Sequence, residues 1–147
     1  MAHNGVSTNH FLKEEQRRRR MSLHDAQTLA KEHFRRMKEE DGRWNGERIA
    51  HIDALIREAH GSPYEVDLHF MSVRGAQRLV ADAIDAVRRR QQCGENRENR
   101  VRIVTGAGNH SAGGVGKIRR MVAAMVTRMR MSCKVINNGC ILVAVRT

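Results

Sequence analysis

The chain has 147 residues, only 3% of them aromatic, and a formal net charge of +11. A chain of this length can bury a core of its own, so we expect one domain with extensions or two very small domains, and the charge favours a polyanionic partner such as RNA or DNA. Three cysteines without CxxC spacing argue against a disulfide framework or a zinc site, and no segment approaches the ~20 apolar residues of a membrane span.

The N-terminus lacks the apolar core of a secretory signal, so we expect an intracellular protein, cytoplasmic or nuclear or within an organelle, with no membrane partner. Charge is unevenly distributed: residues 66–147 hold 15 Lys/Arg against five Asp/Glu, whereas residues 1–65 hold 12 against 11. The polyanion site is therefore expected in the second part. Residues 1–21 are predicted to be a basic, flexible tail, in which Arg17–Arg20 is interpreted as a solvated run, with a nucleic-acid arm or localisation signal as the alternative.

Residues 22–62 predict a helical hairpin. Ser22 to Asp25 resembles a capping box, with Asp in place of Glu, and apolar residues then recur at helical spacing to about Glu40. After a break at "DGRWNG", a second apolar stripe follows and ends before "GSP". Histidines scattered over these helices are better explained as partly exposed helix residues than as metal ligands. This hairpin is also where we expect a protein partner, if the chain has one.

From Tyr64 onward the pattern is β-α-β-α-β-β. The run 64–70 alternates as a strand, with Asp67 and His69 on one face, and Ser72 can cap the helix that follows. A β-rich run at 100–106 leads through a glycine-rich loop to a second helix, and Asn138-Gly139 is typical of a hairpin turn. The predicted fold class is α/β, or two-layer α+β. It has a mixed four-stranded sheet, two helices on one face and the N-terminal helical hairpin in front.

Two motifs support a family resemblance. "VDLHFMSVRGAQRLV" is followed about 30 residues later by "VRIVTGAGNHSAGGVGKIRRMVAAMV" and a terminal hairpin. This arrangement resembles the Smr (small MutS-related) domain of the eukaryotic type over residues 64–147. The resemblance implies a fold similar to the C-terminal domain of bacterial translation initiation factor three. It also implies nicking endonuclease activity on DNA or RNA, with or without a metal, or a role in RNA processing.

The loop from Val104 to Lys117 contains five glycines, which let backbone N–H groups approach a phosphate at the positive end of the next helix. Its spacing matches neither a P-loop nor a dinucleotide fingerprint, so no nucleotide cofactor is expected. The alternative is a flexible connector, which explains two glycines better than five. The predicted phosphate- and nucleic-acid-binding residues are Phe70, Arg102, Thr105, Gly106, Gly108, Asn109, Ser111, Gly113, Gly114, Lys117, Arg119 and Arg120.

The carboxyl ends of the two parallel strands should bring this loop beside Asp67 and His69. With the Smr resemblance, Asp67, His69 and His110 become the candidate catalytic residues of an endonuclease. Asp67 would orient His69 or assist a divalent metal such as Mg²⁺ or Mn²⁺, though no residue is assigned as a metal ligand. Without the resemblance, local capping by Asp67 and ordinary packing of His69 is the preferred interpretation.

Two positions depart from the Smr pattern, which usually has glycine where Phe70 stands and often a basic residue where Ala107 stands. Phe70 would either obstruct a substrate or stack on an unpaired base, a contact worth ~1 to 3 kcal/mol. The alternative function is therefore a catalytically weak or inactive RNA-binding or scaffold module in a ribonucleoprotein or RNA-processing assembly.

Overall fold

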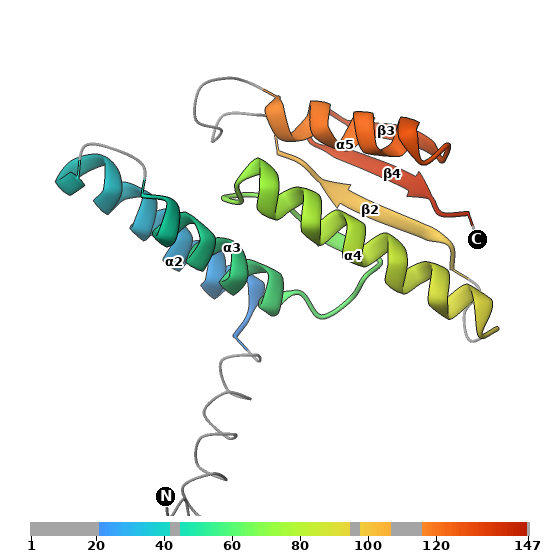
Figure 1. Cartoon of the computed structure of the whole chain (residues 1–147), viewed down its shortest axis with the longest axis horizontal. Coiled ribbons are helices and arrows are strands. Elements are labelled where there is room, and N and C mark those ends of the chain that lie inside the picture. Colours follow the sequence, from blue (N-terminus) through green and yellow to red (C-terminus); the bar gives the residue numbers. More distant parts are fainter. Residues whose placement is uncertain (1–20, 42–44, 95–97, 107–115, 147) are drawn as a thin grey trace, which may run out of the picture.

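The computed structural model describes residues 21–41, 45–94, 98–106 and 116–146 (Figure 1). The predictions for the basic tail and for Ala107, Gly108, Asn109, His110, Ser111, Gly113 and Gly114 lie outside the described residues. Within the described part, no helix is both long and apolar enough to cross a bilayer.

Two helices come first, as predicted. Helix α2 (Leu23–Arg36) continues into the π-helical turn η1 (Met37–Asp41), and α3 (Gly46–Ala59) packs against α2. The Ser22 hydroxyl accepts a hydrogen bond from the Asp25 amide at 3.0 Å, which confirms the predicted cap. Asn45 caps α3 in the same way, through the amides of Glu47 and Arg48.

The remaining elements confirm the predicted β-α-β-α-β-β order. They are β1 (Glu65–Asp67), α4 (Val73–Gln92), β2 (Arg100–Val104), α5 (Lys117–Arg128), β3 (Ser132–Asn137) and β4 (Cys140–Ala144). The strands lie in the order β1-β2-β4-β3, with β1 parallel to β2 and the other pairs antiparallel. Helices α4 and α5 cover one face of this mixed sheet (Figure 1).

Strand β1 is shorter than the alternating run 64–70 predicts. The ladder ends at Asp67, and His69 and Phe70 lie in a turn in which Phe70 has a left-handed φ of 66°. Strand alternation is therefore not what brings Asp67 and His69 together. The turn after the strand does so instead.

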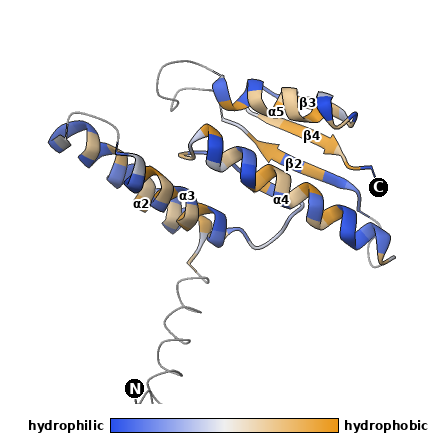
Figure 2. Ribbon diagram, viewed as in Figure 1, coloured by the Kyte–Doolittle hydropathy of each residue, from blue (hydrophilic) through white to orange (hydrophobic). Residues whose placement is uncertain are grey.

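One hydrophobic core joins the helix pair to the sheet. Its members include Ile52 and Ile56 from α3, Ile84 from α4 and Ile103 from β2, all of them fully buried. Figure 2 shows β2 and β4 as largely apolar, while α4 and α5 alternate between apolar and hydrophilic residues along their length. This alternation is the pattern of helices that bury one side against a sheet.

Candidate functional site

The end of β1 holds a carboxylate and an imidazole in direct contact. Oδ1 of Asp67 lies 2.6 Å from Nδ1 of His69 and also accepts a hydrogen bond from the His69 amide at 3.0 Å. A carboxylate only accepts, so Nδ1 carries the hydrogen, and in the neutral imidazole Nε2 is the acceptor nitrogen. The Asp67 side chain is 25% exposed and the His69 side chain is 31% exposed. Asp67 therefore both caps the local backbone and orients the imidazole.

A second histidine, His60, is hydrogen-bonded to this strand. The Asp67 amide donates to Nε2 of His60 at 2.9 Å, and Nδ1 of His60 lies 2.8 Å from the Ile56 carbonyl oxygen. His60 thus links the last turn of α3 to the strand that carries Asp67. Its role as a structural link was not predicted, because it depends on how α3 packs beside β1.

The end of β2 approaches His69 through a glycine. A Cβ atom on Gly106 would lie 2.7 Å from Nε2 of His69, and Gly106 has a φ of +75°. The amides of Thr105 and Gly106 donate to the Gly139 carbonyl at 2.8 and 3.2 Å. These two amides are therefore occupied by the β3–β4 turn, and Gly106 contributes closeness to His69.

The N-terminus of α5 reaches the same place. Its N-cap, Gly116, is in the left-handed region and makes no side-chain cap hydrogen bond, and the first turn contains no acidic residue. The other three described α-helices are each capped by a Ser or Asn side chain. Within the described residues, the first-turn amides of α5 therefore lack the side-chain acceptor that a cap would supply, at the positive end of the helix dipole.

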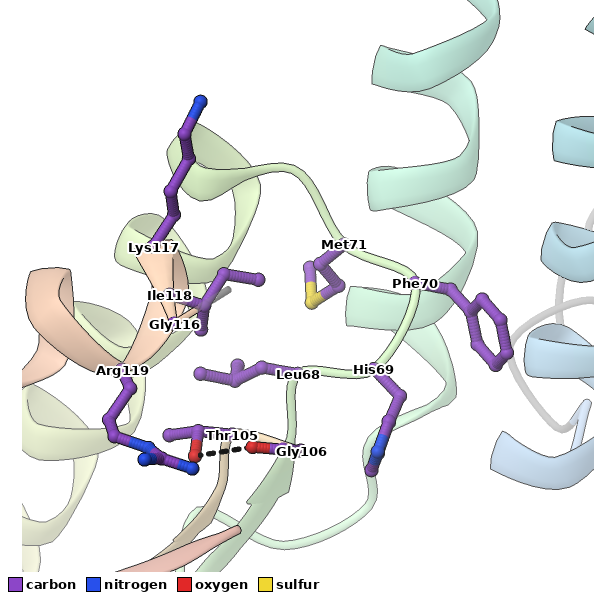
Figure 3. A pocket seen from close by; sticks show the side chains of 10 residues that line it. All are labelled: Leu68, His69, Phe70, Met71, Thr105, Gly106, Gly116, Lys117, Ile118 and Arg119. Atoms are coloured by element: carbon purple, nitrogen blue, oxygen red, sulfur yellow. Dashed lines mark hydrogen bonds between the residues drawn. The ribbon is translucent and has the colours of Figure 1, made fainter. Parts of the chain in front are cut away.

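These segments line a small pocket of about 30 Å³, enough for one water molecule (Figure 3). The ring of Phe70 points away from the space between His69 and Arg119 and packs partly against the core. In this conformation it does not fill the pocket. The lining residues are Leu68, His69, Phe70, Met71, Thr105, Gly106, Gly116, Lys117, Ile118 and Arg119.

The predicted cations are spread around this pocket. Lys117 and Arg119 line it, and Nη2 of Arg119 donates to the carbonyl and side-chain oxygens of Asn138. Arg119 thereby attaches α5 to the hairpin turn. Arg102 and Arg120 are exposed and, in the described part of the molecule, do not line the pocket; Nε of Arg102 lies 3.3 Å from Sγ of Cys140.

Several pocket residues were missed by the sequence reasoning. Met71 was given no role of its own, Ile118 was predicted only as part of the apolar stripe of its helix, and Gly116 was counted in the loop but not in the site. Gly139 was predicted as a turn residue, and a turn prediction does not indicate which other segment the turn approaches. Strand pairing is what brings Gly139 close to Gly106.

The described residues contain no group of three or more His, Cys, Asp or Glu side chains arranged to hold a metal ion. Asp67 is engaged by His69, and the site offers no further carboxylate from the described segments.

Comparison with known proteins places this geometry in a family. The Smr domain model matches residues 66–136. An Smr domain-containing protein of Schizosaccharomyces pombe is 28% identical over 95 residues, which cover 59% of this chain and 43% of that protein. The matched segment thus spans less than half the length of this curated relative.

The solution structure of the B3BP Smr domain superimposes with a TM-score of 0.53 at 21% identity, covering 68% of this chain and 94% of that one. The SMR domain of NEDD4-binding protein 2 gives a TM-score of 0.49 at 24% identity, over 60% and 90% of the two chains. The first of these comparisons shows a shared fold. Smr domains are associated in general with nucleic-acid binding and nuclease activity. Residues 66–136 of the chain are therefore an Smr domain.

Proposed function

We propose that this chain binds a phosphodiester backbone across the opening of the pocket beside His69 and cleaves one strand of RNA or of structured DNA. One observation carries the proposal: the imidazole held by Asp67 and the uncapped N-terminus of α5 face the same small pocket. The first supplies a proton acceptor, and the second supplies a place for an anion. Phosphodiester cleavage needs both.

In this mechanism His69 is the general base. Asp67 holds Nδ1, so Nε2 takes the proton from the attacking water or ribose hydroxyl as its oxygen bonds to phosphorus. The bond to the leaving oxygen breaks, and that oxygen takes up a proton. His110, which lies outside the described residues, is proposed as the donor of this proton.

Negative charge that develops on the phosphate is stabilised by α5. Its first-turn amides and dipole favour an anion, and Lys117 adds a full positive charge at the same end. The glycine at position 116 keeps side-chain atoms away from the approach to these amides. Phosphate contacts position the strand without reading its sequence, which agrees with the scarcity of aromatic residues.

A second candidate function is binding without cleavage. It is favoured by Phe70, which occupies a left-handed position where similar domains usually have glycine. An inactive module would keep the anion site at α5 and lose productive alignment of the strand with His69.

The test compares the full chain with Asp67→Asn and His69→Ala on labelled single-stranded RNA, duplex DNA and branched DNA, with and without a chelator. We expect each variant to lose about 100-fold or more in cleavage rate, because general-base catalysis contributes on that order. Binding should fall much less, because Lys117 and the α5 amides remain. Lys117→Gln should instead lower the affinity for nucleic acid and make that affinity less dependent on salt concentration.

The control is His24→Ala, which removes an exposed imidazole on α2 away from the pocket. Cleavage that persists in Asp67→Asn and His69→Ala at the level of this control would refute the catalytic assignment. Salt-sensitive binding with no cleavage by the wild-type chain would establish the second candidate.

A further inference from the structure

We infer that the groove between α3 and α4 is a second contact surface for the nucleic-acid backbone, outside the pocket of His69. The inference rests on the proposed function and extends it, because it makes the helix pair part of the binding surface. It assigns the groove to phosphodiester groups that flank the strand position held beside His69.

The junction of the two helices is firmly built. Asp53 of α3 accepts hydrogen bonds from the amide and the hydroxyl of Ser72, the N-cap of α4, at 2.9 and 2.5 Å. A Cβ atom on Gly75 would lie only 2.3 Å from Cγ of Asp53, so the absence of a side chain there lets α3 approach. The groove walls are therefore preformed, and ligand binding does not require them to assemble.

Beside this junction lies an open groove of about 710 Å³. Its lining includes the small or apolar side chains Ala50, Ala54, Ala81 and Met125. Three arginines lie along it: Arg57 on α3, and Arg74 and Arg78 one helical turn apart on α4. Arg74, which lines the groove, is only five residues from His69 along the chain.

The guanidinium groups of these three arginines make no hydrogen bond or ion pair within the part of the chain that the structure describes. Other arginines differ: Arg35 bonds to Glu32 and Glu39, and Arg100 bonds to Glu98. The hydrogen bond from Arg100 lowers the pKa of the Glu98 carboxyl below its ordinary value.

Of the residues that the structure describes along the groove, Asp53 is the one carboxylate, and its oxygens accept hydrogen bonds from Ser72. The groove therefore presents three guanidinium groups against one engaged carboxylate. Guanidinium groups match phosphate oxygens in geometry and charge. Among the described residues that line the groove there is no aromatic ring on which a base could stack, so the features favour the sugar–phosphate backbone over the bases.

The experiment measures binding of long single-stranded RNA and DNA by the full chain across a salt series. The groove variant carries Arg57→Gln, Arg74→Gln and Arg78→Gln. We expect binding about tenfold weaker or more at low salt, and the slope of log affinity against log salt should shrink by about 2, as three lost phosphate contacts predict. RNA and DNA should be affected alike, since they share the phosphodiester group.

A matched control removes three charges elsewhere, with Arg36→Gln, Arg89→Gln and Arg128→Gln, all at exposed positions. Circular dichroism and thermal melting verify that both triple variants are folded. If the groove variant binds nucleic acid as tightly as this control, the inference is overturned. The proposed function still stands in that case, provided that Asp67→Asn abolishes cleavage. Absence of nucleic-acid binding by the wild-type chain would remove the proposed function itself.

Poly-glutamate of matched charge tests for an acidic protein as the ligand instead. We expect it to compete poorly with RNA. If it binds the wild-type chain as tightly as RNA and loses that binding in the groove variant, the assignment to nucleic acid is overturned. If the groove variant loses affinity for RNA but not for DNA, the assignment to the phosphodiester group is also overturned, because the contacts would then be to the ribose hydroxyl.

Discussion

Gly106 is confined on two sides. Its φ of +75° is one that side-chain-bearing residues rarely adopt, and the space where its Cβ would stand is filled by Nε2 of His69 at 2.7 Å. Gly139 approaches from the other direction, where a Cβ would lie 3.2 Å from the carbonyl carbon of Gly106. His69 can therefore occupy this position only because residue 106 is a glycine and has no Cβ atom.

We predict that Gly106→Ala displaces the His69 ring and lowers cleavage by about 100-fold, because misplacement of a reacting group by about 1 Å has that effect. Gly94→Ala is the matched control, since Gly94 has a φ of +69° but nothing within 4 Å of its Cβ position. Backbone strain should cost both variants about 1 kcal/mol of stability, and Gly106→Ala should lose more because its Cβ also displaces His69. NMR shifts of the His69 imidazole should change only in Gly106→Ala; unchanged shifts would contradict the prediction.

Phe70 combines a left-handed backbone with a partly buried ring. We predict that Phe70→Gly is more stable than Phe70→Ala by about 1 kcal/mol, because both lose the ring but only glycine relieves the backbone strain. Denaturant unfolding of the two variants measures the difference. Equal stability, or greater stability of the alanine variant, would show that the left-handed conformation is not maintained in solution.

At the scale of elements, α5 ends in a Schellman motif with an arginine at the glycine position. The amide of Arg130 donates to the Thr127 carbonyl and that of Met131 to the Val126 carbonyl, both at 3.1 Å, while Arg130 has a φ of 54°. Buried Met131 completes the hydrophobic contact typical of this motif. The strained residue is exposed, so its side chain adds little that would offset the strain.

We predict that Arg130→Gly raises the stability by about 1 kcal/mol, or a few degrees in Tm. Arg128→Gly removes the same charge two residues earlier, where the backbone is helical, and should cost about 1 kcal/mol. Thermal melting compares the pair. If both substitutions shift Tm in the same direction, the left-handed cap is not the determining feature.

At the scale of the whole molecule, the helix pair and the sheet domain meet at Asp53 and Gly75. In an isolated helix, Gly75→Ala would stabilise α4 by up to ~1 kcal/mol. Here we predict destabilisation, because the new Cβ would collide with the Asp53 carboxylate. In an Asp53→Ala background the same change should become neutral or stabilising. A double-mutant cycle in denaturant measures the coupling, and additive effects would mean that α3 does not hold its place against α4.

The sequence by itself determined the elements and the family. The Ser22 and Ser72 caps, the apolar stripes of the helices and the Asn138-Gly139 turn depend on residues a few positions apart, so local patterns were sufficient for the fold class and the order of elements. The motifs around Asp67 and the glycine-rich loop were sufficient for the Smr resemblance, which the family model confirms for residues 66–136.

Only the tertiary structure decided how the site is assembled. Asp67 and His69 meet because β1 ends early in a turn, and Gly106 contacts His69 because β1 and β2 are parallel neighbours. The engagement of Arg119 by Asn138, and the groove that contains Arg57, Arg74 and Arg78, follow from packing between segments far apart in sequence. Such contacts leave no local pattern, because they depend on where the chain returns in space and not on the spacing of neighbouring residues.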